Sequence, residues 1–137
     1  MLYRAASLRQ MSGERSEQNV AAARRLIECV IGGDVAGVAA LYHDDIRCWR
    51  NLDGRELVKK QALKTVQFLA TLDELSYEDI RVAPTPTGFV QQHILCCKTR
   101  SGEEVRVDAC LVGVVEDGQI VRIDEYVDST AMAPLMG

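Results

Sequence analysis

The 137-residue sequence has no long hydrophobic run, few aromatic residues and no cluster of basic residues. No apolar stretch approaches the roughly 20 residues that cross a bilayer as a helix, so we expect no interaction with a membrane. A net charge of −4, without basic residues interleaved with aromatics, also makes nucleic acid a poor partner. The polar N-terminal residues contain no apolar core of a signal peptide. These absences favour a cytoplasmic protein.

The sequence also lacks the residue spacings that bind metal ions. It has only two histidines, His43 and His93, and its five cysteines form no CxxC pair. An odd number of cysteines, with Cys96 and Cys97 adjacent on one strand, is typical of reduced, buried thiols rather than of a disulfide framework. We therefore expect no metal and no other cofactor.

Hydrophobic content of 47% and charged content of 26% are ordinary for a globular protein. We expect one domain over residues 16–130, with a flexible N-terminal tail at 1–15 and a C-terminal tail at 131–137. Helical periodicity is present from residue 16 to Ile31, over 35–42 and over 53–72, where Asp53 is a candidate helix cap. Alternating patterns predict strands at 44–51, 75–84, 89–99, 104–115 and 119–129.

Three N-terminal helices followed by an antiparallel meander define an α+β fold. A strongly curved, mostly antiparallel sheet with helices on its concave side leaves a cone-shaped cavity, which is a natural pocket for a small molecule.

Four segments carry a family resemblance: "GD" after the first helix, "LYHDDIRCWRN" leading into "DG", "VVEDGQIVRI", and "DEYVDS" near the end. In this order they resemble the nuclear transport factor two-like superfamily, from about Asn19 to Ser129. That superfamily includes ketosteroid isomerases, limonene epoxide hydrolases and SnoaL-like polyketide cyclases. The resemblance implies the cystatin-like, cone-shaped fold. It does not imply one reaction, because this scaffold carries unrelated chemistries.

The stretch "GFVQQHILCC" places three polar residues inside a strand, and the register decides which of them faces the pocket. If Ser101-Gly102 is a two-residue hairpin turn, Gln92 lies opposite Leu111 on the apolar, concave face. His93 then lies on the convex face, through which the resemblance implies a homodimer. A β-bulge would reverse the register, so His93 is kept as a candidate catalytic residue.

Glu125 is the strongest candidate for general acid–base catalysis. It alternates with Ile123 and Val127 on the last strand, so it is expected among apolar neighbours in the pocket, where desolvation raises a carboxyl pKa. The alternative is a structural ion pair between Glu125 and Arg50. Trp49, Arg50 and Asn51 end the first strand at the expected rim of the pocket, as candidates for substrate binding.

The catalytic residues of the enzymes in this superfamily are only partly present at the matching positions of this sequence. The positions that match the catalytic groups of ketosteroid isomerases are Arg50, Leu26 and Leu111, and all three differ in residue type. The Arg-x-Asp pair of limonene epoxide hydrolases is absent from "VQQHI". Glu125, Gln92 and Asn51 fit the looser pocket of SnoaL-like cyclases.

The sequence therefore predicts an isomerase- or cyclase-type enzyme that acts on a small apolar molecule. A non-catalytic ligand-binding or dimeric interaction module is the alternative, and an epoxide hydrolase-like enzyme is the third hypothesis.

Overall fold

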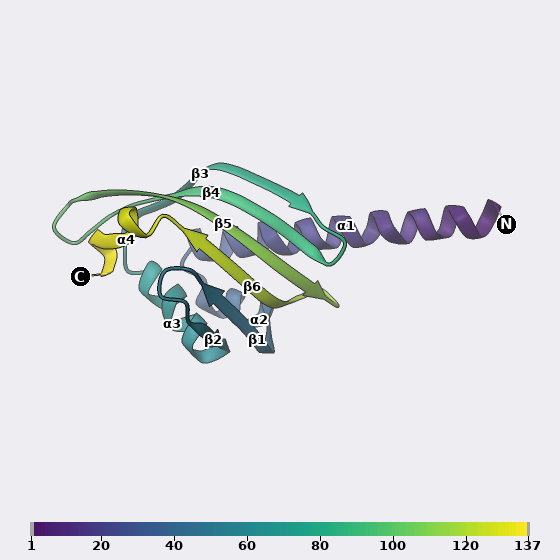
Figure 1. Cartoon of the computed structure of the whole chain (residues 1–137), viewed down its shortest axis with the longest axis horizontal. Helices are drawn as coiled ribbons and strands as arrows, with labels where there is room; N and C mark the ends of the chain where they lie inside the picture. Colours follow the sequence, from purple (N-terminus) through teal and green to yellow (C-terminus); the bar gives the residue numbers. More distant parts are fainter. Residues whose placement is uncertain (1, 137) are drawn as a thin grey trace.

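The computed structural model describes the backbone of residues 2–136 and the side chains of residues 10–136. It contains four helices and six strands in the order shown in Figure 1. The helices are α1 (Leu2–Ile31), α2 (Val35–Leu41), α3 (Lys59–Leu69) and α4 (Ser129–Met136). The strands are β1 (Tyr42–Arg50), β2 (Glu56–Val58), β3 (Asp73–Pro84), β4 (Gly88–Lys98), β5 (Glu104–Glu116) and β6 (Gln119–Val127).

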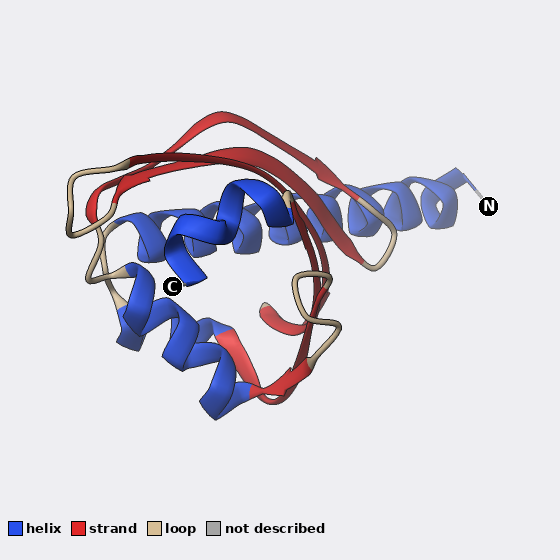
Figure 2. Cartoon of the chain, turned by 60° about the vertical axis from the view of Figure 1, so that its left-hand side comes forward, coloured by secondary structure: helices blue, strands red, loops and turns tan. Residues whose placement is uncertain are grey.

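One six-stranded sheet, in the order β2-β1-β6-β5-β4-β3, organises the fold. Neighbouring strands are antiparallel except β1 and β6, which run parallel. The sheet curves strongly and the helices pack on its concave side, with the N-terminal part of α1 projecting beyond the strands (Figure 2). This confirms the predicted α+β class, with one helix more than the three that the sequence indicates.

Local sequence explains where most helices begin and end. The Gly32-Gly33 pair ends α1, and Asp34 caps α2 by accepting a hydrogen bond from the Gly37 N–H at 2.8 Å. Residues 2–15, expected as a tail, form the first part of α1, a stretch without proline in which leucine, alanine, arginine, glutamine and methionine favour the helix. At the other end, α4 occupies most of the expected C-terminal tail. None of the described helices is long and apolar enough to cross a membrane.

The third helix starts six residues later than predicted. Residues 56–58 pair with β1 as β2, and α3 follows, with the Gln61 Oε1 accepting a hydrogen bond from the Val58 N–H at 3.0 Å. The prediction that Asp53 caps this helix is therefore wrong. Asp53 lies in the turn between β1 and β2 instead.

The β4–β5 connection is a five-residue loop, not the predicted two-residue turn. Lys98 pairs with Glu104, and the loop between them is closed by the Thr99 N–H donating to the Glu103 carbonyl at 2.9 Å. This moves the register by one residue, so Gln91, not Gln92, lies opposite Leu111. Because a one-residue slip turns every side chain of a strand to the other face, Gln91 and His93 face the concave side and Gln92 is exposed outside.

Candidate functional site

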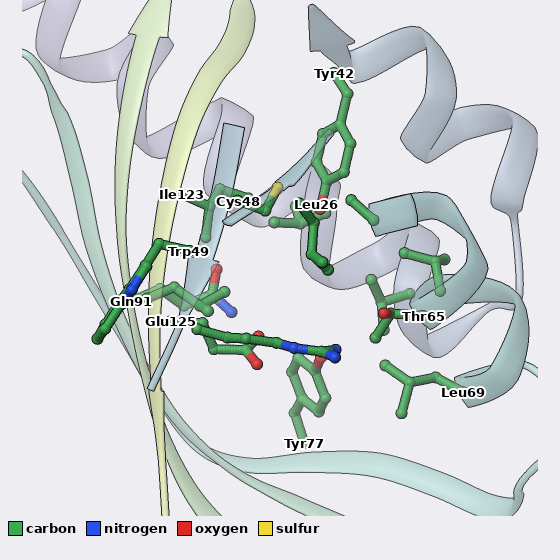
Figure 3. A pocket seen from close by; sticks show the side chains of 16 residues that line it. Leu26, Tyr42, Cys48, Trp49, Thr65, Leu69, Tyr77, Gln91, Ile123 and Glu125 are labelled. Carbon is green, nitrogen blue, oxygen red and sulfur yellow. The ribbon is translucent and has the colours of Figure 1, made fainter. Parts of the chain in front are cut away.

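A cavity of about 80 Å³ lies between α1, α3 and the concave face of the sheet. Its helical walls are apolar except for Thr65, whereas its polar groups come from the strands. The helical side chains are Leu26 and Val30 of α1 and Ala62, Thr65, Val66 and Leu69 of α3. Figure 3 shows Tyr42 and Tyr77 entering from opposite sides, with Gln91 and Glu125 on the sheet between them. The arrangement is a small apolar chamber with one acidic group.

Glu125 points into this cavity from β6, as the alternation of β6 predicts. Burial raises the pKa of its carboxyl, and the positive charge of Arg50 opposes this shift without cancelling it. The carboxylate forms no hydrogen bond or ion pair with any described side chain, so the structural pair with Arg50 is not formed. An acid with a raised pKa and no partner is suited to exchanging protons with a bound molecule.

Arg50 also lines the cavity, but its guanidinium is bound elsewhere. Its Nε and Nη2 donate to Oδ1 and Oδ2 of Asp53 at 3.0 and 2.8 Å. This two-point ion pair raises the pKa of Arg50 and lowers that of Asp53. Arg50 is thus a fixed positive charge at the edge of the cavity.

Tyr42 and Tyr77 are site residues that the sequence analysis missed. Both line the cavity, and neither hydroxyl is hydrogen-bonded to another described residue. Burial raises the pKa of both phenols above the ordinary value, so both stay protonated and can donate to a ligand oxygen. Tyr42 begins β1 and Tyr77 lies on the far edge strand, and no local pattern marks either as part of a shared site.

Gln91 and His93 form a buried polar pair on β4. The Gln91 Nε2 donates to the His93 Nδ1 at 3.2 Å, and the His93 ring stacks on Tyr77 with centroids 3.8 Å apart and an interplanar angle of 10°. Gln91 lines the cavity, and its Oε1 has no hydrogen-bond partner among the described residues. His93 lies behind Tyr77 and does not line the cavity. Burial lowers its pKa to about 4, so its ring is neutral near pH 7.

The other sequence candidates divide into two groups. Leu111 and Ile123 line the cavity as expected. Trp49, the last but one residue of β1, also lines the edge of the cavity, but its indole points to the outer face (Figure 3), where it packs on Tyr126 with ring centroids 5.3 Å apart. Val127 faces the concave side beyond the cavity, next to α4.

Asn51 and Gln92 do not supply the expected polar contacts. The Asn51 side chain both donates to the Val127 carbonyl at 3.0 Å and accepts from the Val127 N–H at 2.9 Å. Its amide therefore ties the β1–β2 turn to β6, which the sequence could not show because this contact depends on the parallel β1–β6 pairing. The prediction that Gln92 faces the pocket is wrong, since the actual register turns its side chain outward.

Cys48 also lines the cavity, yet it is a poor nucleophile. Burial raises the pKa of its thiol to about 12, which keeps it protonated at neutral pH. All five cysteines are free. The described residues contain no group of three or more side chains arranged to hold a metal ion.

Comparison with known proteins identifies the family. Residues 23–123 match the family model of the SnoaL-like domain, so the chain belongs to the SnoaL-like family. The sequence has no significant match among curated proteins.

Several solved structures share the fold at low sequence identity. A "putative polyketide cyclase" from Xanthomonas campestris pv. campestris superposes with a TM-score of 0.77 at 16% identity, covering 90% of this chain and 99% of the other. A "putative isomerase" from Bacillus subtilis gives 0.74 at 15% identity, covering 88% and 94%. An epoxide hydrolase of M. tuberculosis, similar to limonene epoxide hydrolase, gives 0.70 at 16% identity, covering 87% and 89%. Similarity at this level establishes the fold alone.

Proposed function

We propose that the protein is a cofactor-independent enzyme that performs general acid–base chemistry, of the isomerase or cyclase type, on a small and largely apolar molecule. The observation that carries the proposal is Glu125, a carboxyl group without an ion pair, with its pKa raised by burial, inside an apolar cavity. A carboxyl group with a raised pKa is a stronger base when ionised and can return the proton that it takes, which is the requirement for moving a proton between two carbon atoms.

The surrounding hydroxyls complement that role. In the proposed reaction on a β,γ-unsaturated ketone, the Glu125 carboxylate removes a proton from the carbon between the carbonyl group and the C=C bond. The electron pair of the broken C–H bond forms a new C=C bond, and the π electrons of the carbonyl group move onto its oxygen. Tyr42 and Tyr77 donate hydrogen bonds to that oxygen. Glu125 then returns the proton to the far carbon of the original C=C bond. The electrons on oxygen re-form the carbonyl group and the double bond moves into conjugation with it, so that atoms and charge balance. Gln91, rather than Gln92, holds a polar group of the substrate.

Cavity size limits the substrate. A volume of about 80 Å³ lies well below the roughly 300–1,000 Å³ of typical ligand pockets. The apolar walls of α1 and α3 favour hydrocarbon over charged groups. A small cyclic or branched ketone fits this description better than a polycyclic one.

A non-catalytic ligand-binding module is the second candidate. The small cavity favours it, as do the departures from the ketosteroid isomerase pattern at Arg50, Leu26 and Leu111. An epoxide hydrolase-like activity is the third. The solved epoxide hydrolase of similar fold and the acidic group at Glu125 support it, while the missing Arg-x-Asp on β4 opposes it.

The three candidates separate in one assay series. In the first assay the purified protein is incubated with a small β,γ-unsaturated cyclic ketone, and the conjugated product is detected by its ultraviolet absorption. In the second it is incubated with cyclohexene oxide, and the diol is detected by chromatography. We expect conversion of the ketone above the buffer rate. Diol formation alone would replace the proposal with the hydrolase. Binding of cyclohexanone in NMR spectra without turnover of either compound would replace it with the binding module.

We also propose a homodimer formed through the outer face of the sheet, in a reducing, cytoplasmic setting consistent with the five free cysteines. Val112 and Tyr126 are exposed on this face, with 36% and 48% of their surface accessible. Exposed apolar residues grouped on one sheet face are typical of interaction surfaces.

A Val112→Lys variant is expected to weaken this dimer at least about tenfold, because a charge placed in the interface must be desolvated. Light scattering after gel filtration measures the mass of each variant. Phe68→Lys is the matched control, since Phe68 is 44% exposed on α3, which lies on the concave side of the sheet. A monomeric wild-type protein would contradict the proposed dimer.

A further inference from the structure

Arg50 and Glu125 are neighbours that do not pair. They are register partners on the parallel strands β1 and β6, and both line the cavity. Side chains at such positions start about 5 Å apart, well within reach of a long guanidinium. Opposite charges so placed would ordinarily form an ion pair, which would lower the pKa of the acid. Another contact must therefore hold the Arg50 guanidinium away from the Glu125 carboxylate.

Asp53 supplies that restraint from the β1–β2 turn. Besides its two contacts with Arg50, its Oδ1 accepts a hydrogen bond from the Arg55 N–H at 3.1 Å. The turn itself is closed by the Gly54 N–H donating to the Arg50 carbonyl at 2.9 Å, with Gly54 at a φ of +66° that favours glycine. Asp53 is thus fixed in place before it binds the guanidinium.

We propose that Asp53 is a positioning residue that holds the Arg50 guanidinium away from Glu125, so that this carboxyl remains free to exchange protons. The catalytic value of this restraint rests on the function proposed above, but the restraint itself does not. Asp53 does not line the cavity, so it acts through Arg50 rather than on a bound molecule.

Among the side chains that line the cavity with Glu125, Arg50 is the one whose charge affects the pKa of the Glu125 carboxyl most. Titratable neighbours within the cavity are Cys48 and Tyr42 from β1 and Tyr77 from β3, and all three are held neutral by burial. The side chains that line the cavity from α1 and α3 are uncharged. Moving Arg50 is therefore the change that most alters the environment of Glu125.

An Asp53→Asn variant tests the inference without any substrate. Asparagine keeps the shape and can still accept from the Arg55 N–H, but it loses the charge that holds the guanidinium. Arg50 is then expected to turn to Glu125 and lower the pKa of its carboxyl by about one unit or more. Carbon-13 NMR titration of the Glu125 carboxyl measures this, with the signal assigned by its loss in Glu125→Gln.

Removing a nearby negative charge would also lower the pKa of Glu125 through space, so Arg50 must be shown to mediate the effect. In an Arg50→Gln background, Asp53→Asn is expected to shift the pKa of Glu125 by less than a third of the single-variant shift. Equal shifts in both backgrounds, or no shift in the single variant, would overturn the inference.

Two further variants serve as controls for the charge and the position of Asp53. Asp124→Asn removes a carboxylate from the residue next to Glu125, where Asp124 pairs with Arg122 at 2.9 Å, and it is expected to leave the pKa of Glu125 nearly unchanged. Asp53→Glu retains the charge and is expected to restore most of the wild-type value. A shift in Asp124→Asn as large as in Asp53→Asn would also refute the inference. Because no reaction is followed, an inactive wild-type protein does not affect this result.

Discussion

A Glu125→Gln variant is expected to convert the best ketone substrate about 100- to 10,000-fold more slowly than the wild type, the range that positioned general acid–base groups contribute. Glutamine has nearly the same shape as glutamate, so the cavity keeps its outline while losing the one group that exchanges protons. Steady-state kinetics on the same substrate measures the loss. The comparison is made on kcat, because a uniform binding effect would appear in KM instead.

The variant should remain folded, and its melting temperature should equal or exceed that of the wild type. An acid that is desolvated and has no ion pair costs stability when it is charged, and a neutral amide avoids this cost. Circular dichroism thus separates lost chemistry from lost structure. Asp124→Asn serves as the neighbouring control and should keep full activity, because Asp124 lies on the outer face and is bound to Arg122. Full activity in Glu125→Gln would contradict the proposed mechanism.

The pH profile provides a second check on the same residue. As the base, Glu125 must be deprotonated, so kcat/KM should fall as the pH falls through its native pKa. That pKa lies above the ordinary value because of burial, so the loss should begin at a higher pH than for an exposed glutamate. The residual activity of Glu125→Gln should lack this limb of the profile.

Sequence alone predicted the inward side chains of β6 correctly, because that prediction needs only local alternation. Ile123 and Glu125 share a face in any register of the strand, and the Asp117-Gly118 turn before β6 is tight, with both residues at positive φ. The same reasoning failed on β4, where the faces depended on the length of one loop. A five-residue loop in place of a two-residue turn moved Gln91 and His93 inward.

Other parts of the site depend on contacts between distant strands. Tyr42 and Tyr77 line the same cavity only because the sheet curves, and the amino-acid sequence does not give the amount of curvature. Asp53 looked like a helix cap because a glutamate follows three residues later. Its role as partner of Arg50 depends on the turn that β2 creates when it pairs with β1. Local patterns identify the elements, while these long-range contacts place the polar groups.

His93 leads to a prediction about stability rather than catalysis. The free energy of unfolding is expected to fall by about 2 kcal/mol from this residue between pH 7 and pH 5. Burial lowers the pKa of His93 to about 4, whereas the unfolded chain has the ordinary value of 6.5. Between these values the unfolded state binds more protons than the folded state. The stabilisation is therefore complete above about pH 6.5 and is lost as the pH falls toward 4.

Glu125 acts in the opposite direction over part of this window. Its pKa is raised in the folded state, so the folded state takes up protons first and gains stability as the pH falls. The wild-type slope is the sum of both effects, and a His93→Phe variant separates them. Phenylalanine retains a flat ring against Tyr77 but does not titrate, so its stability should fall about 2 kcal/mol less between pH 7 and pH 5 than that of the wild type.

Urea unfolding at the two pH values measures this difference. His43→Gln is the matched control, since it removes the only other histidine of the sequence and is expected to keep the wild-type dependence. The result bears directly on the register of β4. If His93 lay on the outer face, where the two-residue turn would have placed it, the imidazole would be solvated and could protonate freely. Equal pH dependence in the wild type and His93→Phe would therefore contradict the burial of this ring, and with it the inward position of Gln91 on the same face.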